Sequence, residues 1–88
     1  MRRGWPERAA RQLDLPVEAF GAARLTVGGR DRVFIENHRG LVAFSPQEVV
    51  VRTDFGRVAV AGRGLVLESL WPDRLTVAGQ IDTIRFQE

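Results

Sequence analysis

The 88-residue sequence contains no cysteine, lysine or tyrosine, only one histidine, and no long apolar run. Without cysteine the chain can form neither a disulfide nor a thiolate nucleophile or thiolate metal site. No stretch approaches the roughly 18 apolar residues that a membrane-spanning helix needs, and the N-terminus lacks the apolar stretch of a signal peptide. We therefore expect one small cytoplasmic domain that is stabilised by packing, with self-association as a further source of stability.

The net charge of +2 is unevenly distributed along the chain, although all 13 basic residues are arginine. Residues 1–14 carry four arginines against two acidic residues, whereas residues 15–88 carry nine of each. The charge therefore belongs to the N-terminal arm. The rest of the chain is not the basic body that a nucleic-acid-binding protein usually presents.

Residues 5–13 are predicted to form a short helix. Pro6 suits a first-turn position, Glu7 favours the positive end of the helix dipole, and Pro16 ends the helix by restricting the residue before it. Residues 1–16 are thus interpreted as a basic helical arm and residues 17–88 as the main domain. The helix either caps one end of a sheet or contacts a membrane surface or a partner. The contact residues would be Arg2, Arg3, Trp5, Arg8 and Arg11.

After Pro16 the apolar residues alternate with a period of two. Eight such runs, divided by glycine-, proline- and asparagine-containing turn signals, predict an all-β domain of about eight short, mainly antiparallel strands. Two of the predicted turns fall at residues 62–64 and at Gly79. The runs are residues 24–27, 32–35, 41–44, 49–52, 57–60, 65–70, 74–77 and 81–86.

A weak internal repeat accompanies these runs, because "RLTVGG" at 24–29, "RVAVAG" at 57–62 and "RLTVAG" at 74–79 are similar. The three copies are unequally spaced along the chain, which excludes an array of fixed period. A rolled meander or small two-layer sandwich fits best, and a β-solenoid-like stack is the alternative. In either case we expect the last strand to leave an open edge that can pair with another copy.

Glu36 and His38 are the one place where catalytic chemistry could lie. In a strand the two side chains would share a face about 7 Å apart, and they lack the nucleophile or metal that acid–base chemistry would need. The other interpretation is a turn over residues 37–40, in which Asn37 and Gly40 supply positive φ angles. We favour the turn, and we predict that the protein is not an enzyme. A small hydrolase acting through Glu36 and His38 is the least favoured hypothesis.

No cofactor or metal is predicted, since one histidine and scattered carboxylates make no ligand set. The "GRG" at residues 62–64 lacks the third glycine and the βαβ unit of a dinucleotide site, so it is interpreted as a hairpin turn. The aromatic residues do not interleave with a basic stripe, as they do in barrels that stack bases. A nucleic-acid-binding β-barrel, similar in size to Sm-like proteins, remains the alternative function.

Three motifs give the chain a resemblance to a known family. The first is "IENHRGL" at 35–41. The second comprises Thr53, Gly56, Val58, Val60, Gly62, Leu65 and Leu67, and the third comprises Val77, Gly79, Ile81, Ile84 and Phe86. In order and spacing they resemble the small sporulation proteins of the YabP/YqfC family, and the "W-x-E-x-x-A-x-x-L-x-L-P" arm is similar to the YqfC branch. The sequence departs from that pattern in its all-arginine composition and at residues 71–73.

The resemblance implies a non-enzymatic protein of endospore-forming bacteria, made in the mother cell and active at the forespore surface in engulfment or coat assembly. It also implies a link with a membrane-anchored sporulation protein, and peripheral contact with the outer forespore membrane. We therefore expect an assembly or scaffold module that associates with itself or with such a partner. The family signature is expected to determine the fold through Glu36, Asn37, His38, Gly40, Gly56, Gly62 and Gly79.

Overall fold

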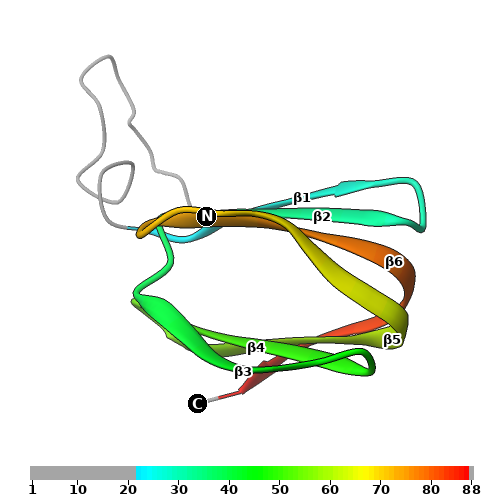
Figure 1. Ribbon diagram of the computed structural model, residues 1–88. Helices are drawn as coiled ribbons and strands as arrows, with labels where there is room; N and C mark the ends of the chain where they lie inside the picture. The colour runs from blue at the N-terminus through cyan, green and yellow to red at the C-terminus, as the bar shows by residue number, and fades with distance from the viewer. Residues whose placement is uncertain (1–21, 88) are drawn as a thin grey trace.

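The computed structural model describes residues 22–87 as a single sheet of six strands (Figure 1). All five neighbouring pairs are antiparallel, in the order β1-β2-β6-β5-β4-β3. The all-β prediction is confirmed, whereas the predicted helix over residues 5–13 and the arm over residues 1–16 lie outside the described residues. The strands are β1 Arg24–Gly28, β2 Arg32–Glu36, β3 Gly40–Ser45, β4 Glu48–Thr53, β5 Gly56–Leu70 and β6 Arg74–Gln87.

The prediction of eight strands is wrong, because four of the runs join in pairs to make two long strands. Runs 57–60 and 65–70 both belong to β5, and runs 74–77 and 81–86 both belong to β6. The predicted turns at residues 62–64 and at Gly79 are instead bends inside these strands, where the β5–β6 register shifts or the backbone takes a positive φ. Glycine inside a strand commonly marks such a bend or a close approach of another backbone.

These bends fold the sheet into two layers (Figure 1). Of the long strand β6, only residues 74–78 pair with β2, and of the long strand β5, only residues 56–61 pair with β4. The upper layer of the figure therefore contains β1 and β2, the lower layer contains β3 and β4, and the β5–β6 hairpin passes from one layer to the other. The strands form one antiparallel sheet that is folded on itself, and their order is not that of the predicted meander, because β6 rather than β3 lies beside β2.

The edges of the sheet are β1 and β3. The expectation that the last strand forms an edge is wrong, because β6 lies between β2 and β5. The alternation in the sequence indicates that β6 is a strand, but it does not indicate which strand lies on the side of β6 away from β5. That neighbour is β2, which is separated from β6 along the chain by β3, β4 and β5, and no local pattern records the pairing.

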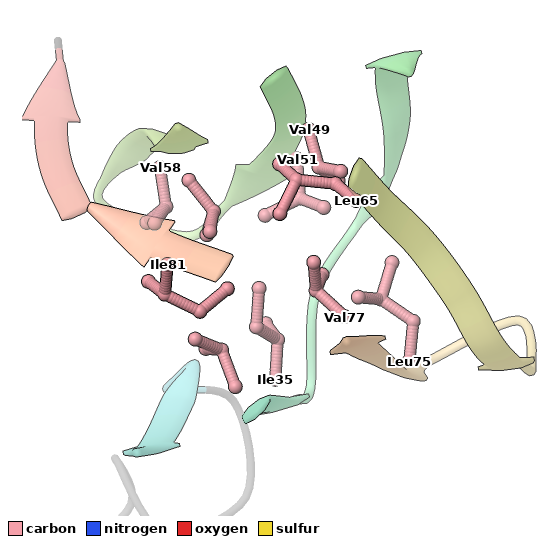
Figure 2. Close-up of a cluster of buried hydrophobic side chains, with 10 residues drawn as sticks. Ile35, Val49, Val51, Val58, Leu65, Leu75, Val77 and Ile81 are labelled. Carbon is pink, nitrogen blue, oxygen red and sulfur yellow. The ribbon is translucent and has the colours of Figure 1, made fainter. Parts of the chain in front are cut away.

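The core lies between the two layers and consists almost entirely of branched aliphatic side chains. Figure 2 shows the labelled side chains from β2, β4, β5 and β6 pointing toward one another. Their period-two spacing follows from the pleat, which sends successive side chains to opposite faces of a strand. The ten residues are Val33, Ile35, Val49, Val51, Val58, Val60, Leu65, Leu75, Val77 and Ile81.

Each short hairpin holds one bend of the long hairpin through its turn. In the β3–β4 turn, the carbonyl groups of Pro46 and Gln47 accept hydrogen bonds from the amides of Leu65 and Gly62, at 2.8 and 3.0 Å. In the β1–β2 turn, the carbonyl groups of residues 30 and 31 accept from the amides of residues 81 and 79, at 2.9 and 3.1 Å. Each bend is therefore held by two hydrogen bonds to a turn, the bend of β5 by the β3–β4 turn and the bend of β6 by the β1–β2 turn.

The offset between the last two copies of the sequence repeat has a structural counterpart in the β5–β6 hairpin. When "RVAVAG" is aligned with "RLTVAG", residue 60 corresponds to residue 77, which lies later in the chain. A shift of the same length toward the N-terminus takes residue 84 to residue 67. Residue 60 lies opposite residue 84, and residue 77 lies opposite residue 67, so the offset converts one pair into the other. The two copies of the repeat thus occupy equivalent positions in the two layers.

Candidate interaction site

The family-signature turn lies at one end of the folded sheet, between β2 and β3. Asn37 is the one non-glycine residue with positive φ in the described part of the chain, at 61°, and Gly40 has a φ of 137°. The Asn37 side-chain amide also donates to the carbonyl oxygen of Ala22 at 3.2 Å. Asparagine and glycine therefore supply the backbone conformations and the side-chain contact that this corner requires.

His38 is part of this corner, and only 6% of its surface is exposed. Its backbone amide donates to the carbonyl of Asp73 at 3.0 Å, and its Nδ1 accepts from the amide of Gly40 at 3.0 Å. Because Nδ1 accepts, the neutral ring carries its proton on Nε2. That buried Nε2 has no hydrogen-bond partner among the residues that the structure describes.

Glu36 belongs to a different environment from that of His38. It is exposed on β2, opposite Arg24 of β1 and Arg74 of β6. Opposite charges on neighbouring strands stabilise a sheet, which gives Glu36 a structural role. None of the described hydrogen bonds joins the carboxylate to the His38 ring, so the two residues singled out in the sequence do not form an acid–base pair here.

A pocket of 450 Å³ lies beside the turn, at the point where the described chain begins. Its walls carry two arginines and two acidic residues, so their formal charges balance. At the neighbouring β5–β6 turn the Arg74 guanidinium lies 5.7 Å from the ring centroid of the exposed Trp71, a cation–π contact. The residues lining the pocket are Ala22, Ala23, Arg24, Glu36, Asn37, Asp73 and Arg74.

β3 combines an open edge with exposed apolar side chains. Among the strands that the structure describes it pairs with β4 alone, and its sequence "GLVAFS" contains no charged residue. Leu41, Val42 and Phe44 are 37%, 38% and 46% exposed. In the sequence Val42 and Phe44 alternate like the residues of the core strands, so their exposure could not be predicted from periodicity. The exposure arises because β3 is the last strand of its layer.

A second exposed apolar site lies where the β4–β5 turn meets the end of β6. The rings of Phe55 and Phe86 are 5.8 Å apart between centroids, at an interplanar angle of 51°. The turn beneath them is held by Thr53, whose hydroxyl donates to the carbonyl of Gly56 at 2.6 Å and accepts from the Phe55 amide at 3.2 Å. Gly56, another signature position, has a φ of 124° that favours glycine.

Several arginines of the sheet are engaged by acidic residues. Arg32 binds Glu68 through two hydrogen bonds, of 2.9 and 2.7 Å, and this contact holds the pKa of the Glu68 carboxyl below its usual range. Arg85 contacts Glu48 at 3.2 Å, and residues 63 and 82 form a further pair at 3.9 Å. These three pairings leave Arg32, Arg63 and Arg85 less available for phosphate, the contact on which the nucleic-acid alternative depends.

The described residues contain no group of three or more potential metal ligands of the His, Cys, Asp or Glu type. They also form no helix that is long and apolar enough to cross a membrane. The predicted contact residues of the arm, Arg2, Arg3, Trp5, Arg8 and Arg11, lie outside the described part of the chain and are not placed by the structure.

Comparisons with known proteins agree with the sequence motifs. The model of the YabP family matches residues 21–88, the region that contains all six strands. The uncharacterized protein YqfC of Bacillus subtilis (strain 168) is 33% identical over 87 residues, which cover 98% of this chain and 90% of that protein. No solved structure matches the chain.

Proposed function

The chain belongs to the YabP family, and from this premise we propose that it is a non-enzymatic assembly or scaffold module of sporulation. It would act in the mother cell at the forespore surface, during engulfment or spore coat assembly. Its work would be to bind other proteins, including further copies of itself and a membrane-anchored sporulation protein.

The observation that carries this proposal is the edge strand β3 of the described sheet, whose three large apolar side chains face solvent. Natural proteins protect open edges with charge, proline or a covering segment, because an unprotected edge pairs with other chains. An apolar, uncharged edge is therefore a feature that favours a binding role.

The N-terminal arm is proposed as the peripheral contact with the outer forespore membrane. Four of its residues are arginines, which are attracted to anionic lipid headgroups, and Trp5 favours the interface between lipid and water. We expect Arg8→Glu together with Arg11→Glu to weaken binding to vesicles that contain anionic lipid. Arg30→Glu, in the β1–β2 turn, is the matched control and should leave vesicle binding nearly unchanged.

The test of the main proposal is the mass of the purified protein in solution, together with its retention by proteins extracted from forespore membranes. We expect concentration-dependent oligomers, or specific retention by a membrane-anchored protein. A protein that stays monomeric at every concentration and is retained by no forespore membrane component would contradict the proposal.

A further inference from the structure

We propose that two copies of the chain pair along β3, antiparallel to each other, about a two-fold axis between Val42 and Ala43. This inference rests on the proposed function, because it names the surface through which copies of the assembly module meet. The pairing would continue the lower layer of one copy into the lower layer of the other.

The inner face of β3 is where apolar surface remains uncovered. Leu41 and Phe44 lie opposite Val51 and Val49, two side chains that are completely buried. The apolar row of the core thus continues onto β3 and stops there, exposed at the open edge. One more strand beside β3 would cover Leu41 and Phe44, and burial of apolar surface of this kind is the main favourable contribution to association.

The β-bulge of β3 determines which register such a strand would take. The register shifts between Leu41 and Ala43, so that Gly40, Ala43 and Ser45 share the outer face with their β4 partners, while Leu41 and Phe44 share the inner face. When β3 pairs with itself, both faces match if Gly40 lies opposite the partner's Ser45. Leu41 then lies opposite the partner's Phe44. A slip of one residue would place inner-face residues opposite outer-face ones, a mismatch that strongly disfavours the slipped register.

The charges that flank β3 are complementary in the same register. Arg52 lies opposite Gly40 in β4, and its Nη1 reaches to 3.9 Å from the point where a Gly40 Cβ would stand. Its guanidinium therefore extends over the glycine toward the open edge. At the other end of the hairpin, Glu48 lies opposite Ser45.

Across the proposed interface, Arg52, Gly40, the partner's Ser45 and the partner's Glu48 would form one row on the outer face. The two residues in the middle of the row are small, so the arginine and the glutamate can approach each other above them. Glu48 already accepts from Arg85 at 3.2 Å, but a carboxylate has two oxygens and can accept from a second guanidinium. The two-fold axis generates this charge pair twice, which favours antiparallel over parallel pairing.

The self-complementarity of β3 identifies the occupant as a second copy of this chain. Its apolar row matches itself, and the basic end of the β3–β4 hairpin meets the acidic end of the other copy. An interface of one short strand from each copy is small, so we expect a weak dimer with a dissociation constant of roughly 1 to 100 µM.

The test is sedimentation velocity of the full-length chain across that concentration range. Phe44→Glu places a charge on the inner row and should weaken the dimer at least about tenfold, since buried unpaired charge is costly. Val66→Glu is the matched control, because Val66 is 51% exposed but lies in β5, which is not a neighbour of β3 in the sheet. It should leave the dimer unchanged, and circular dichroism establishes that both variants are folded.

A second measurement tests the pairing itself. Arg52→Glu and Glu48→Arg should each weaken the dimer, because like charges then meet at both ends of the interface. An equimolar mixture of the two variants should form a heterodimer, in which opposite charges meet again at both ends. A defect of folding cannot produce this recovery.

Three outcomes would overturn the inference. One is a dimer that all of these variants leave unchanged, and another is a mixture that does not recover. The third is a chain that is monomeric throughout the concentration range. If that monomer is still retained by a forespore membrane protein, pairing through β3 is refuted but the proposed function stands. If Trp5→Ala abolishes the dimer while the Phe44, Arg52 and Glu48 variants leave it unchanged, the N-terminal arm is the contact instead.

Discussion

Gly62 and Gly79 end equivalent copies of the sequence repeat, and each lies against the backbone of the opposite long strand. A Cβ at Gly79 would stand 2.6 Å from the carbonyl oxygen of Gly64, and a Cβ at Gly62 would overlap the carbonyl oxygen of Gln80. Backbone cannot move aside as a flexible side chain can. The fold of the sheet into two layers therefore depends on the absence of a side chain at both positions.

We expect Gly62→Ala and Gly79→Ala each to lower the free energy of unfolding by at least about 2 kcal/mol, because the added methyl group forces the strands apart. Thermal and urea denaturation measure the effect. Gly28→Ala is the matched control, since its Cβ would have only ordinary contacts at 3.8 and 3.9 Å. Equal stability of all three variants would show that the bends do not require close approach.

The core between the layers provides a second prediction. Ile35 is completely buried, and Ile35→Ala should lower the free energy of unfolding by about 2 to 5 kcal/mol through lost burial and the cavity that remains. Val66→Ala removes a side chain that is more than half exposed and should cost less than about 0.5 kcal/mol. Similar losses in the two variants would contradict the assignment of the core.

Two substitutions in the β2–β3 corner distinguish the role of the His38 side chain from the role of the Gly40 backbone conformation. His38→Ala removes the acceptor of the Gly40 amide, and we expect a loss of about 1 to 3 kcal/mol in stability while association is retained. Gly40→Val should be more damaging, because a φ of 137° is strained for a β-branched residue. Denaturation and sedimentation measure both quantities. Loss of association in a folded His38→Ala protein would indicate that the ring contacts a partner.

The Arg32–Glu68 contact predicts how stability changes with pH. The hydrogen bond from Arg32 lowers the pKa of Glu68 in the folded protein. Its contribution is therefore complete above the ordinary glutamate range near pH 4 to 5, and it is lost as pH falls through the lowered folded-state pKa. Both side chains are exposed, so the effect is small. Glu68→Gln should destabilise slightly at pH 7 and lose that difference at low pH. A difference that grows on acidification would contradict this assignment.

The strands of this protein were predictable because alternation is a local property of the sequence. Every predicted run from residue 24 onward lies in a strand, and alternating residues such as Val33 and Ile35 are in the core. The count of eight strands was wrong because glycine marks both turns and bends. Gly62 is needed in the bend because the carbonyl of Gln80 lies against it. That carbonyl belongs to another strand, so the local sequence around Gly62 does not reveal the contact.

The candidate site was predictable to a similar extent. Residue types alone indicated that Asn37 and Gly40 adopt positive φ at a corner. The burial of His38 was not predictable, because it depends on the β5–β6 turn packing beside it through Asp73. The exposure of Phe44 was not predictable either, because an alternating apolar residue is covered only if a further strand lies beyond it.

The position of β6 between a strand that is near in sequence, β5, and one that is distant, β2, has a consequence for the order in which the chain folds. The β5–β6 hairpin connects strands that follow each other in sequence, whereas β2 reaches β6 only across the whole of β3, β4 and β5. Closing the shorter loop costs less entropy, so we expect residues 56–87 to form the folding nucleus onto which the two short hairpins dock. Val60→Ala should therefore slow refolding, whereas Val33→Ala should mainly accelerate unfolding, and stopped-flow kinetics would reveal a reversed order.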